Sequence, residues 1–218
     1  MANIKIDLHT HSILSPDGGL KERDYVELLE QEKLDCIAVT DHNRIDFALS
    51  MQQKLGKQII VGEEISSSDG EIIGLFLSKP ISRDLSAIET VKEIKKQNGL
   101  VCIPHPFETA RKGINEKVLL KIIEQVDCIE VFNGRSLQSQ TRELARQFVK
   151  TYTLAPVGSS DSHCRIGIGN TYTIISEIPN RKNLVSLLRE GKVNEKAAPK
   201  LAYLCPKINR LKKCFKFS

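Results

Sequence analysis

Short apolar runs rich in β-branched residues alternate along this chain with segments in which apolar residues recur at the period of a helix. The apolar runs predict strands near residues 4–8, 36–40, 58–65, 100–104, 128–132, 153–158 and 171–175. The helical periods predict helices at 22–32, 85–97, 115–125, 137–150 and 183–190, with a less regular one at 47–55. This alternation is typical of repeated βα units and a parallel sheet.

One interruption breaks the alternation. The polar segment Ser67-Ser68-Asp69-Gly70-Glu71 follows the third apolar run, and a further apolar run covers 72–77. Gly and Asp in a short polar segment between two apolar runs favour a hairpin turn. We therefore predict an added strand after the third one.

Every histidine of the chain lies at the end of one of these apolar runs. The five are His9, His11, His42, His105 and His163, and the carboxylates Asp17, Glu64 and Asp161 lie in or beside the same kind of segment. The carboxyl ends of strands in βα units meet on one face, so these side chains are expected to lie together. Imidazole and carboxylate are ligands of first-row divalent ions, and eight of them exceed the needs of one tetrahedral ion. The sequence predicts a site for two or three metal ions.

Two of the segments share one geometry. His9 and His11 are two residues apart at the end of a strand, as are Asp161 and His163. Residues two apart in an extended chain point to the same side, so each pair can reach one ion.

Other interpretations of single residues remain open. Asp17 lies in a Ser-Pro-Asp-Gly turn that needs no metal, and His105, between two prolines, is open to a structural role as a buried histidine. Asp41 can either orient an imidazole or cap a turn. Glu63 and Glu64 are neighbours in a strand, so only one of them can face the centre.

Composition places the chain among ordinary globular proteins. It has 218 residues, of which 40% are hydrophobic, and no apolar run approaches the roughly 20 residues that span a bilayer. The six cysteines form no CxxC pair, and no secretory signal favours a disulfide framework. We expect one domain over residues 1–195, a cytoplasmic location, and buried thiols at Cys36, Cys102 and Cys128. Cys164 is close enough to His163 in sequence to approach the site.

The segments that carry these residues resemble a known family. IDLHTHSILSPDG, AVTDH, VGEEIS, IPHPF and GSSDSH are similar, in order and spacing, to the motifs of the PHP (polymerase and histidinol phosphatase) domain of metal-dependent phosphoesterases. The resemblance covers most of the chain, from residue 4 to residue 163. It implies a distorted (β/α)7 TIM-like barrel with a metal cluster at the carboxyl ends of its strands.

The resemblance also implies how the ligands divide among the ions. One ion is expected on His9, His11, Glu64 and Asp161, with Glu64 bridging to a second ion on His105, and a third ion on Asp17, His42 and His163. It selects Glu64 over Glu63, because the family glutamate precedes a hydrophobic-Ser pair. Many members carry a further histidine at the end of the fifth strand, and some carry one shortly after the glutamate motif, but this chain has neither. The second ion is therefore expected to be short of ligands: either Asn133 or solvent completes the site, or the site is weakly occupied.

The implied reaction is hydrolysis of a phosphomonoester, either a nucleotide or a phosphorylated small metabolite, by a metal-bound hydroxide. Closely spaced divalent ions can activate water, bind a phosphoryl group and stabilise the departing oxygen. Asp161 and His163 are expected at the reaction centre, with Arg111 and Arg135 binding phosphate unless both are solvated. The residue types suit Zn, Mn and Fe alike.

The last residues, 196–218, form a basic tail that supplies much of the net charge of +5. The tail either touches nucleic acid or an anionic membrane surface, or is a solvated, partly disordered terminus, and the solvated terminus is favoured. Two alternatives to a phosphatase therefore stay open: a nuclease acting on phosphodiesters, and a noncatalytic module stabilised by its metals. The sequence carries no sign of the oligomeric state.

Overall fold

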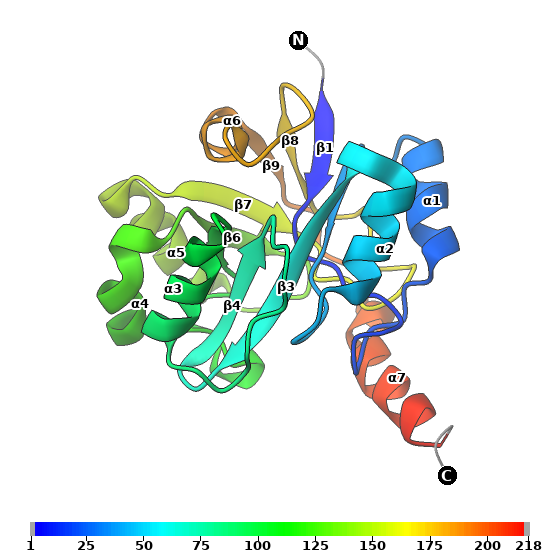
Figure 1. Cartoon of the computed structure of the whole chain (residues 1–218), viewed down its shortest axis with the longest axis horizontal. Helices are drawn as coiled ribbons and strands as arrows, with labels where there is room; N and C mark the ends of the chain where they lie inside the picture. The colour runs from blue at the N-terminus through cyan, green and yellow to red at the C-terminus, as the bar shows by residue number, and fades with distance from the viewer. Residues whose placement is uncertain (1–2, 216–218) are drawn as a thin grey trace.

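The computed structural model describes residues 3–215, and its strands form one curved sheet (Figure 1). The order of strands across this sheet is β7-β6-β5-β4-β3-β2-β1-β8-β9. Their bounds are β1 Ile4–Asp7, β2 Cys36–Val39, β3 Ile59–Ser67, β4 Gly70–Leu75, β5 Leu100–Ile103, β6 Cys128–Asn133, β7 Ala155–Ser159, β8 Tyr172–Ile175 and β9 Lys192–Asn194.

The sheet curls into a nearly closed barrel. β1, β2 and β3 pair in parallel, and so do β5, β6 and β7. The two ends of this curve meet just beyond the strands, where Thr10 and Ser162 form a parallel bridge and the His11 amide donates to the Ser162 carbonyl at 2.9 Å. The predicted distorted α/β barrel is confirmed.

Residues 3–215 contain seven α-helices, of which the first six begin and end close to their predicted limits. They are α1 Glu22–Glu30, α2 Asp46–Leu55, α3 Ala87–Lys96, α4 Glu116–Ile122, α5 Ser139–Tyr152, α6 Leu184–Glu190 and α7 Cys205–Cys214. Local signals explain several starts. Ser86 accepts a hydrogen bond from the Glu89 amide and Glu89 reaches back to Ser86, while Asn115 caps α4 by accepting from the Val118 amide.

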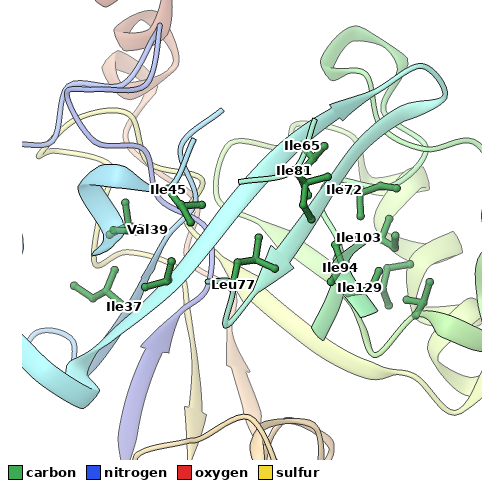
Figure 2. Close-up of a cluster of buried hydrophobic side chains, with 14 of the residues drawn as sticks. Ile37, Val39, Ile45, Ile65, Ile72, Leu77, Ile81, Ile94, Ile103 and Ile129 are labelled. Atoms are coloured by element: carbon green, nitrogen blue, oxygen red, sulfur yellow. The ribbon is translucent and has the colours of Figure 1, made fainter. Parts of the chain in front are cut away.

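Alternate residues of the strands pack into two separate apolar clusters. Ile37, Val39, Ile65, Ile72 and Ile103 contribute to the cluster that the outer helices α1 to α5 cover (Figure 2). The opposite faces of β1 to β7 supply a second cluster, which also contains three leucines of α6. Both faces of the sheet are therefore buried, as in other sheets of βα units.

The predicted hairpin is present. β4 runs antiparallel to β3, with Glu64 opposite Ile73 and Ser66 opposite Glu71. Gly70 has a φ of +136°, a conformation that favours glycine. β4 also pairs antiparallel with β5, so the hairpin is inserted into the sheet between two parallel halves.

The last predicted strand differs in direction from a regular βα repeat. β8 pairs antiparallel with β1, and β9 pairs antiparallel with β8. Residues 160–171 contain no helix that could carry the chain back across the sheet. A parallel strand needs such a crossover, so the chain returns antiparallel instead.

The expected solvated tail is the main error of the sequence interpretation. Residues 205–214 form α7, which lies against the loops at the carboxyl ends of the strands (Figure 1). Residues 216–218 of the tail lie outside the described residues. Tertiary contacts, rather than propensity, stabilise this helix, because short isolated helices are marginal in water.

The cysteine interpretation is partly wrong as well. Cys36, Cys102 and Cys128 are buried free thiols, but Cys164 and Cys205 form a disulfide. The two are 41 residues apart in sequence, and α7 alone brings Cys205 to the loop after β7. No helix within residues 3–215 is long and apolar enough to cross a bilayer.

Candidate metal centre

A cavity of about 700 Å³ opens at the carboxyl ends of the strands. The side chains that line it include Asp17, His42, Glu64, His105, Asp161 and His163. They come from the loops after β1, β2, β5 and β7 and from β3 itself, and α7 supplies one wall. The strand ends thus converge, and the fold brings all eight predicted ligands to this cavity or its floor.

Four of these residues form the central cluster. The Nε2 atoms of His9 and His11 are 3.0 Å apart, and each is 3.2–3.3 Å from Glu64 Oε2. Asp161 Oδ1 is 3.6 Å from His9 Nε2 and 3.5 Å from His11 Nε2. Donor atoms placed tetrahedrally around a zinc-sized ion lie about 3.4 Å apart. These donor atoms fit the coordination of a divalent ion.

Glu64 joins this cluster to a second one, which Glu64 forms with His105 and with the neighbouring His42. Its other oxygen, Oε1, is 3.0 Å from His105 Nε2, while Oε2 is 3.3 Å from His42 Nδ1. The nearby histidines, first among them His9, overcome the effect of burial and hold the pKa of Glu64 well below its usual range. An ionised carboxylate that faces two sets of imidazoles has the geometry of a bridging ligand.

Sequence reasoning missed Glu71, which lies beside the second cluster. Its Oε2 is 3.7 Å from His105 Nε2, and its Oε1 is 3.7 Å from His42 Nδ1. Burial, and next to it the charge of Glu64, raises the pKa of Glu71 to about 8. The signal for Glu71 was the predicted hairpin. Glu64 and Ser66 are two residues apart on β3, so their side chains share a face, and Ser66 lies opposite Glu71 on β4. Opposite residues of paired strands point to the same face, so Glu71 lies on the face of Glu64.

The third cluster consists of His11, Asp17, His42 and His163. Asp17 Oδ1 is 3.3 Å from His163 Nε2 and 3.7 Å from His42 Nε2. Burial lowers the pKa of His42 to about 4 and that of His163 well below its usual range. Both rings are therefore neutral at pH 7, which is the form that binds metal.

Glu130, on β6, is a second residue that sequence reasoning missed. Its Oε1 lies 2.9 Å from His9 Nδ1, and its Oε2 accepts hydrogen bonds from the His105 amide and the Asn133 side chain. Burial alone would lower the pKa of His9, but Glu64 and Glu130 raise it to about 10. Glu130 thus orients His9 from behind, leaving Nε2 directed at the central cluster.

Asn133 is committed elsewhere and does not complete the second cluster. Its Oδ1 accepts from Arg111 Nη1 at 2.9 Å and from the Arg135 amide at 2.9 Å. The expectation that Asn133 completes the second set of ligands therefore finds no support in the geometry. Glu71 is the better placed oxygen donor.

Arg111 and Arg135 meet at one wall of the cavity. Arg111 forms an ion pair with Asp161, and Arg135 Nη1 is 3.1 Å from Asp161 Oδ1 and 3.0 Å from His163 Nδ1. Burial, together with the charge of Arg111, lowers the pKa of Arg135 to about 10. Two guanidinium groups this close favour an anion in front of them.

Three further charged residues, each on a segment that carries a predicted ligand, lie away from the centre. Glu63 faces the other side of β3, where its Oε2 accepts from the Ile81 amide at 2.9 Å. Asp41 accepts from the Ser12 amide and hydroxyl, so it fixes the loop after His11. Arg165 pairs with Asp24 and Glu27 of α1.

Family models match most of this chain. A model described as the PHP domain matches residues 7–156, and one described as PHP-associated matches residues 140–193. The chain belongs to the PHP domain family. The PHP match runs from the last residue of β1 to the start of β7 and includes six of the eight predicted ligands.

Relatives and solved PHP-like structures agree with this assignment. Two uncharacterized proteins of Methanocaldococcus jannaschii are 31% and 32% identical to the chain. The first match covers 80% of this chain and 72% of the relative, and the second covers 60% of this chain and 82% of the relative. A two-domain protein of Bacteroides vulgatus, described as containing a predicted PHP-like metal-dependent phosphoesterase, has the same fold. Its TM-score is 0.73 at 20% identity, over 96% of this chain and 70% of that one.

Proposed function

We propose that this PHP protein is a metal-dependent phosphatase that hydrolyses a small phosphomonoester, either a nucleotide or a phosphorylated metabolite. One observation carries the proposal: overlapping groups of histidine and carboxylate donors, whose ligand atoms lie within 4.8 Å of one another in each group, adjoin a pair of partly buried arginines in one cavity. Metals and guanidinium groups are both ligands of phosphate, and their convergence favours phosphoryl chemistry.

Each group of donors would hold one divalent ion. His9, His11, Glu64 and Asp161 would bind the first, and Asp17, His42 and His163 the third. Glu64 would bridge to the second ion on His105, with Glu71 as the added oxygen ligand. The donors suit Zn, Mn or Fe, and such ions, when bound, activate water and stabilise negative charge on phosphoryl oxygens.

The residues of the chain would bind and orient the substrate. Arg111 and Arg135 lie side by side against Asp161, so a phosphate dianion in front of them would be held by both guanidinium groups. Their position also sets the direction of the phosphoryl group, since the metal ligands Asp161 and His163 lie beside it. The Arg135 side chain is largely enclosed by its neighbours, since only 16% of it is exposed.

The cavity favours a small substrate over a polymer. Its volume of about 700 Å³ is in the range of roughly 300–1,000 Å³ that is typical of small-molecule sites. Tyr203, Pro206 and Leu211 close one side of the cavity, next to the metal ligands. A phosphomonoester has one substituent on its phosphate, so one opening of the cavity is enough for it. A nucleic acid strand continues on both sides of each phosphate and would need two openings.

The first test combines metal analysis with two substrates. The protein is prepared with Mn²⁺, its metal content per chain is measured, and p-nitrophenyl phosphate and bis-p-nitrophenyl phosphate are assayed. We expect at least two ions per chain, a preference for the monoester, and a loss of turnover of about 100-fold or more in His11→Ala. Arg165→Ala, which lies on the outer surface, serves as the control and keeps its activity.

The outcomes separate the alternatives. A preference for the diester would indicate a nuclease. A loaded metal centre with no turnover on either compound, and none on a panel of phosphorylated metabolites, would favour the noncatalytic module. A chain that binds no metal would contradict the proposal.

A further inference from the structure

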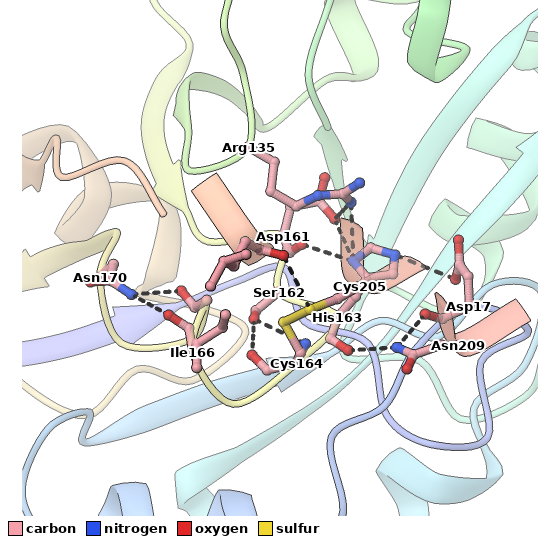
Figure 3. Close-up of a disulfide and its surroundings, with 12 residues drawn as sticks. Asp17, Arg135, Asp161, Ser162, His163, Cys164, Ile166, Asn170, Cys205 and Asn209 are labelled. Carbon is pink, nitrogen blue, oxygen red and sulfur yellow. Dashed lines mark hydrogen bonds and ion pairs between the residues drawn. A yellow bond between two sulfur atoms is a disulfide. The ribbon is translucent and has the colours of Figure 1, made fainter. Parts of the chain in front are cut away.

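The C-terminal helix α7 contacts two loops that carry ligands of the third cluster. One loop, after β1, carries Asp17, and the other, after β7, carries His163. Asn209 of α7 lies between them and is hydrogen-bonded to both (Figure 3). These loops are far apart in sequence, so α7 is in a position to fix one relative to the other.

Asn209 bridges the two loops directly. Its Nδ2 donates to the carbonyl oxygen of Asp17 and to the carbonyl oxygen of His163, both at 2.9 Å (Figure 3). Both acceptors belong to metal-ligand candidates, not to their neighbours. The approach is close, since a Cβ added at Gly19 would lie 2.7 Å from this nitrogen.

Two cations of α7 act on the Asp17 loop. Arg210 Nη2 is 2.7 Å from Asp17 Oδ2, whereas Asp17 Oδ1 faces His163 and His42. Lys213 donates to the carbonyls of Ser15 and Gly18, on either side of Asp17. The carboxylate of Asp17 is thus held at one oxygen by α7 and is directed by the other into the cluster.

The disulfide holds the start of the same helix. Cys205, the first residue of α7, is bonded to Cys164, the residue after His163. The disulfide thus holds the first residue of α7, and the contacts of Asn209, Arg210 and Lys213 hold the helix from its middle onward. Without the bond, α7 would be tied to these two loops by the partly buried polar contacts of Asn209, Arg210 and Lys213.

We propose that α7 is a clamp that positions Asp17 and His163, and that the Cys164–Cys205 disulfide makes the affinity of the third metal cluster depend on thiol oxidation. The inference rests on the proposed metal-dependent function. A dithiol reductant supplies the two electrons: its thiolates displace the two sulfurs in turn, Cys164 and Cys205 each gain a proton, and the dithiol becomes a cyclic disulfide. Asn209, Arg210 and Lys213 are positioning residues in this scheme.

The test measures Mn²⁺ binding to the full-length chain by equilibrium dialysis. Wild type in the oxidised form is compared with Cys205→Ser, Asn209→Ala and Arg210→Gln, and with reduced wild type after the dithiol has been removed under nitrogen. We expect about tenfold weaker binding of the third ion in each, with the first two ions unaffected. Lys212→Ala, an exposed lysine of the same helix, is the matched control and binds all three ions as wild type does.

The melting temperature of the metal-free chain separates positioning from general stability. A merely structural helix would lower this temperature in the variants and leave the relative affinities of the three ions unchanged, which would overturn the inference. The Arg210 side chain is 64% exposed, so Arg210→Gln remains folded even if the other variants do not. Arg210→Lys keeps the charge beside Asp17 and is expected to recover most of the affinity.

The other results are also decisive. Equal affinity for the third ion in oxidised wild type, Cys205→Ser and Arg210→Gln would overturn the inference while leaving the proposed function intact. A wild-type chain that binds no third ion would overturn it too. A wild-type chain that binds no Mn²⁺ at all would overturn both the inference and the proposed function.

Discussion

Glu63 and Glu64 show how one position along a strand decides the chemistry of a carboxyl group. Glu64 faces His9, His11, His42 and His105, and these four histidines hold its pKa well below the usual range. Glu63 faces the opposite side of β3, where its Oε1 has no hydrogen-bond partner and Oε2 has only the Ile81 amide. Burial raises the pKa of Glu63 to about 7.

This shift gives a prediction for stability against pH. The pKa of Glu63 rises from an ordinary value of 4.5 to about 7 on folding, so the folded chain binds more protons between these values. The free energy of unfolding therefore falls as pH rises through this window, by about 3 kcal/mol. In Glu63→Gln this loss is absent, and the variant should exceed wild type in stability at pH 8 and match it near pH 4.

Urea denaturation of the metal-free chain at several pH values checks this prediction. Glu30→Gln, an exposed carboxyl replaced in the same way, is the control and should follow wild type at every pH. If Glu63→Gln followed wild type as well, the carboxyl would be ionised in the folded chain and the assigned environment would be wrong.

At the scale of elements, the β3–β4 hairpin determines the make-up of the second cluster. A regular βα repeat would bring one strand end to this place, but the antiparallel β4 adds the start of a strand as well. Glu71 is the second residue of β4 and so arrives beside Glu64 and His105. The hairpin thus supplies an oxygen where a histidine of the family motif is absent.

Replacing Glu71 therefore tests this role of the hairpin. Glu71→Gln removes the charge but keeps the size of the side chain, and we expect it to weaken binding of one Mn²⁺ by about tenfold or more. Titration of Mn²⁺ followed by electron paramagnetic resonance measures this loss. Glu124→Gln, an exposed replacement, is the control, and an unchanged second site in Glu71→Gln would exclude Glu71 as a ligand.

At the scale of the whole molecule, the fold buries several carboxylates at the candidate metal centre. Glu64, Glu130 and Asp161 lie within or beside one cluster with almost no exposure. Buried charges need partners, and divalent ions bound only by the folded chain would provide them. The stability of the molecule is therefore expected to depend on metal.

Removal of the ions should lower the melting temperature. An ion present at 100 times its dissociation constant stabilises the folded chain by about 3 kcal/mol per site, which for a chain of this size shifts the transition by roughly 5–10 °C. Calorimetry with and without EDTA, followed by reloading with Mn²⁺, measures the shift. A melting temperature that did not respond to free Mn²⁺ would contradict the prediction.

The sequence by itself determined the features that depend on neighbours along the chain. Apolar alternation defined the strands, caps such as Ser86 and Asn115 defined helix starts, and the placement of His9, His11 and His105 after strands indicated one shared face. Glycine and aspartate at 69–70 likewise indicated the hairpin. Local geometry, set by side-chain period and turn chemistry, is readable from short windows of sequence.

Only the tertiary structure decided which distant residues meet. Glu130 carries no local mark of function, and Glu71 is marked only by the hairpin; both join the site because β6 and β4 pass beside it. Cys164 and Cys205, like Asn209 and Asp17, are brought together by α7, whose sequence alone predicts a solvated tail. The physical reason is that α7 is stabilised by contacts with loops from both ends of the chain, and no local pattern encodes such contacts.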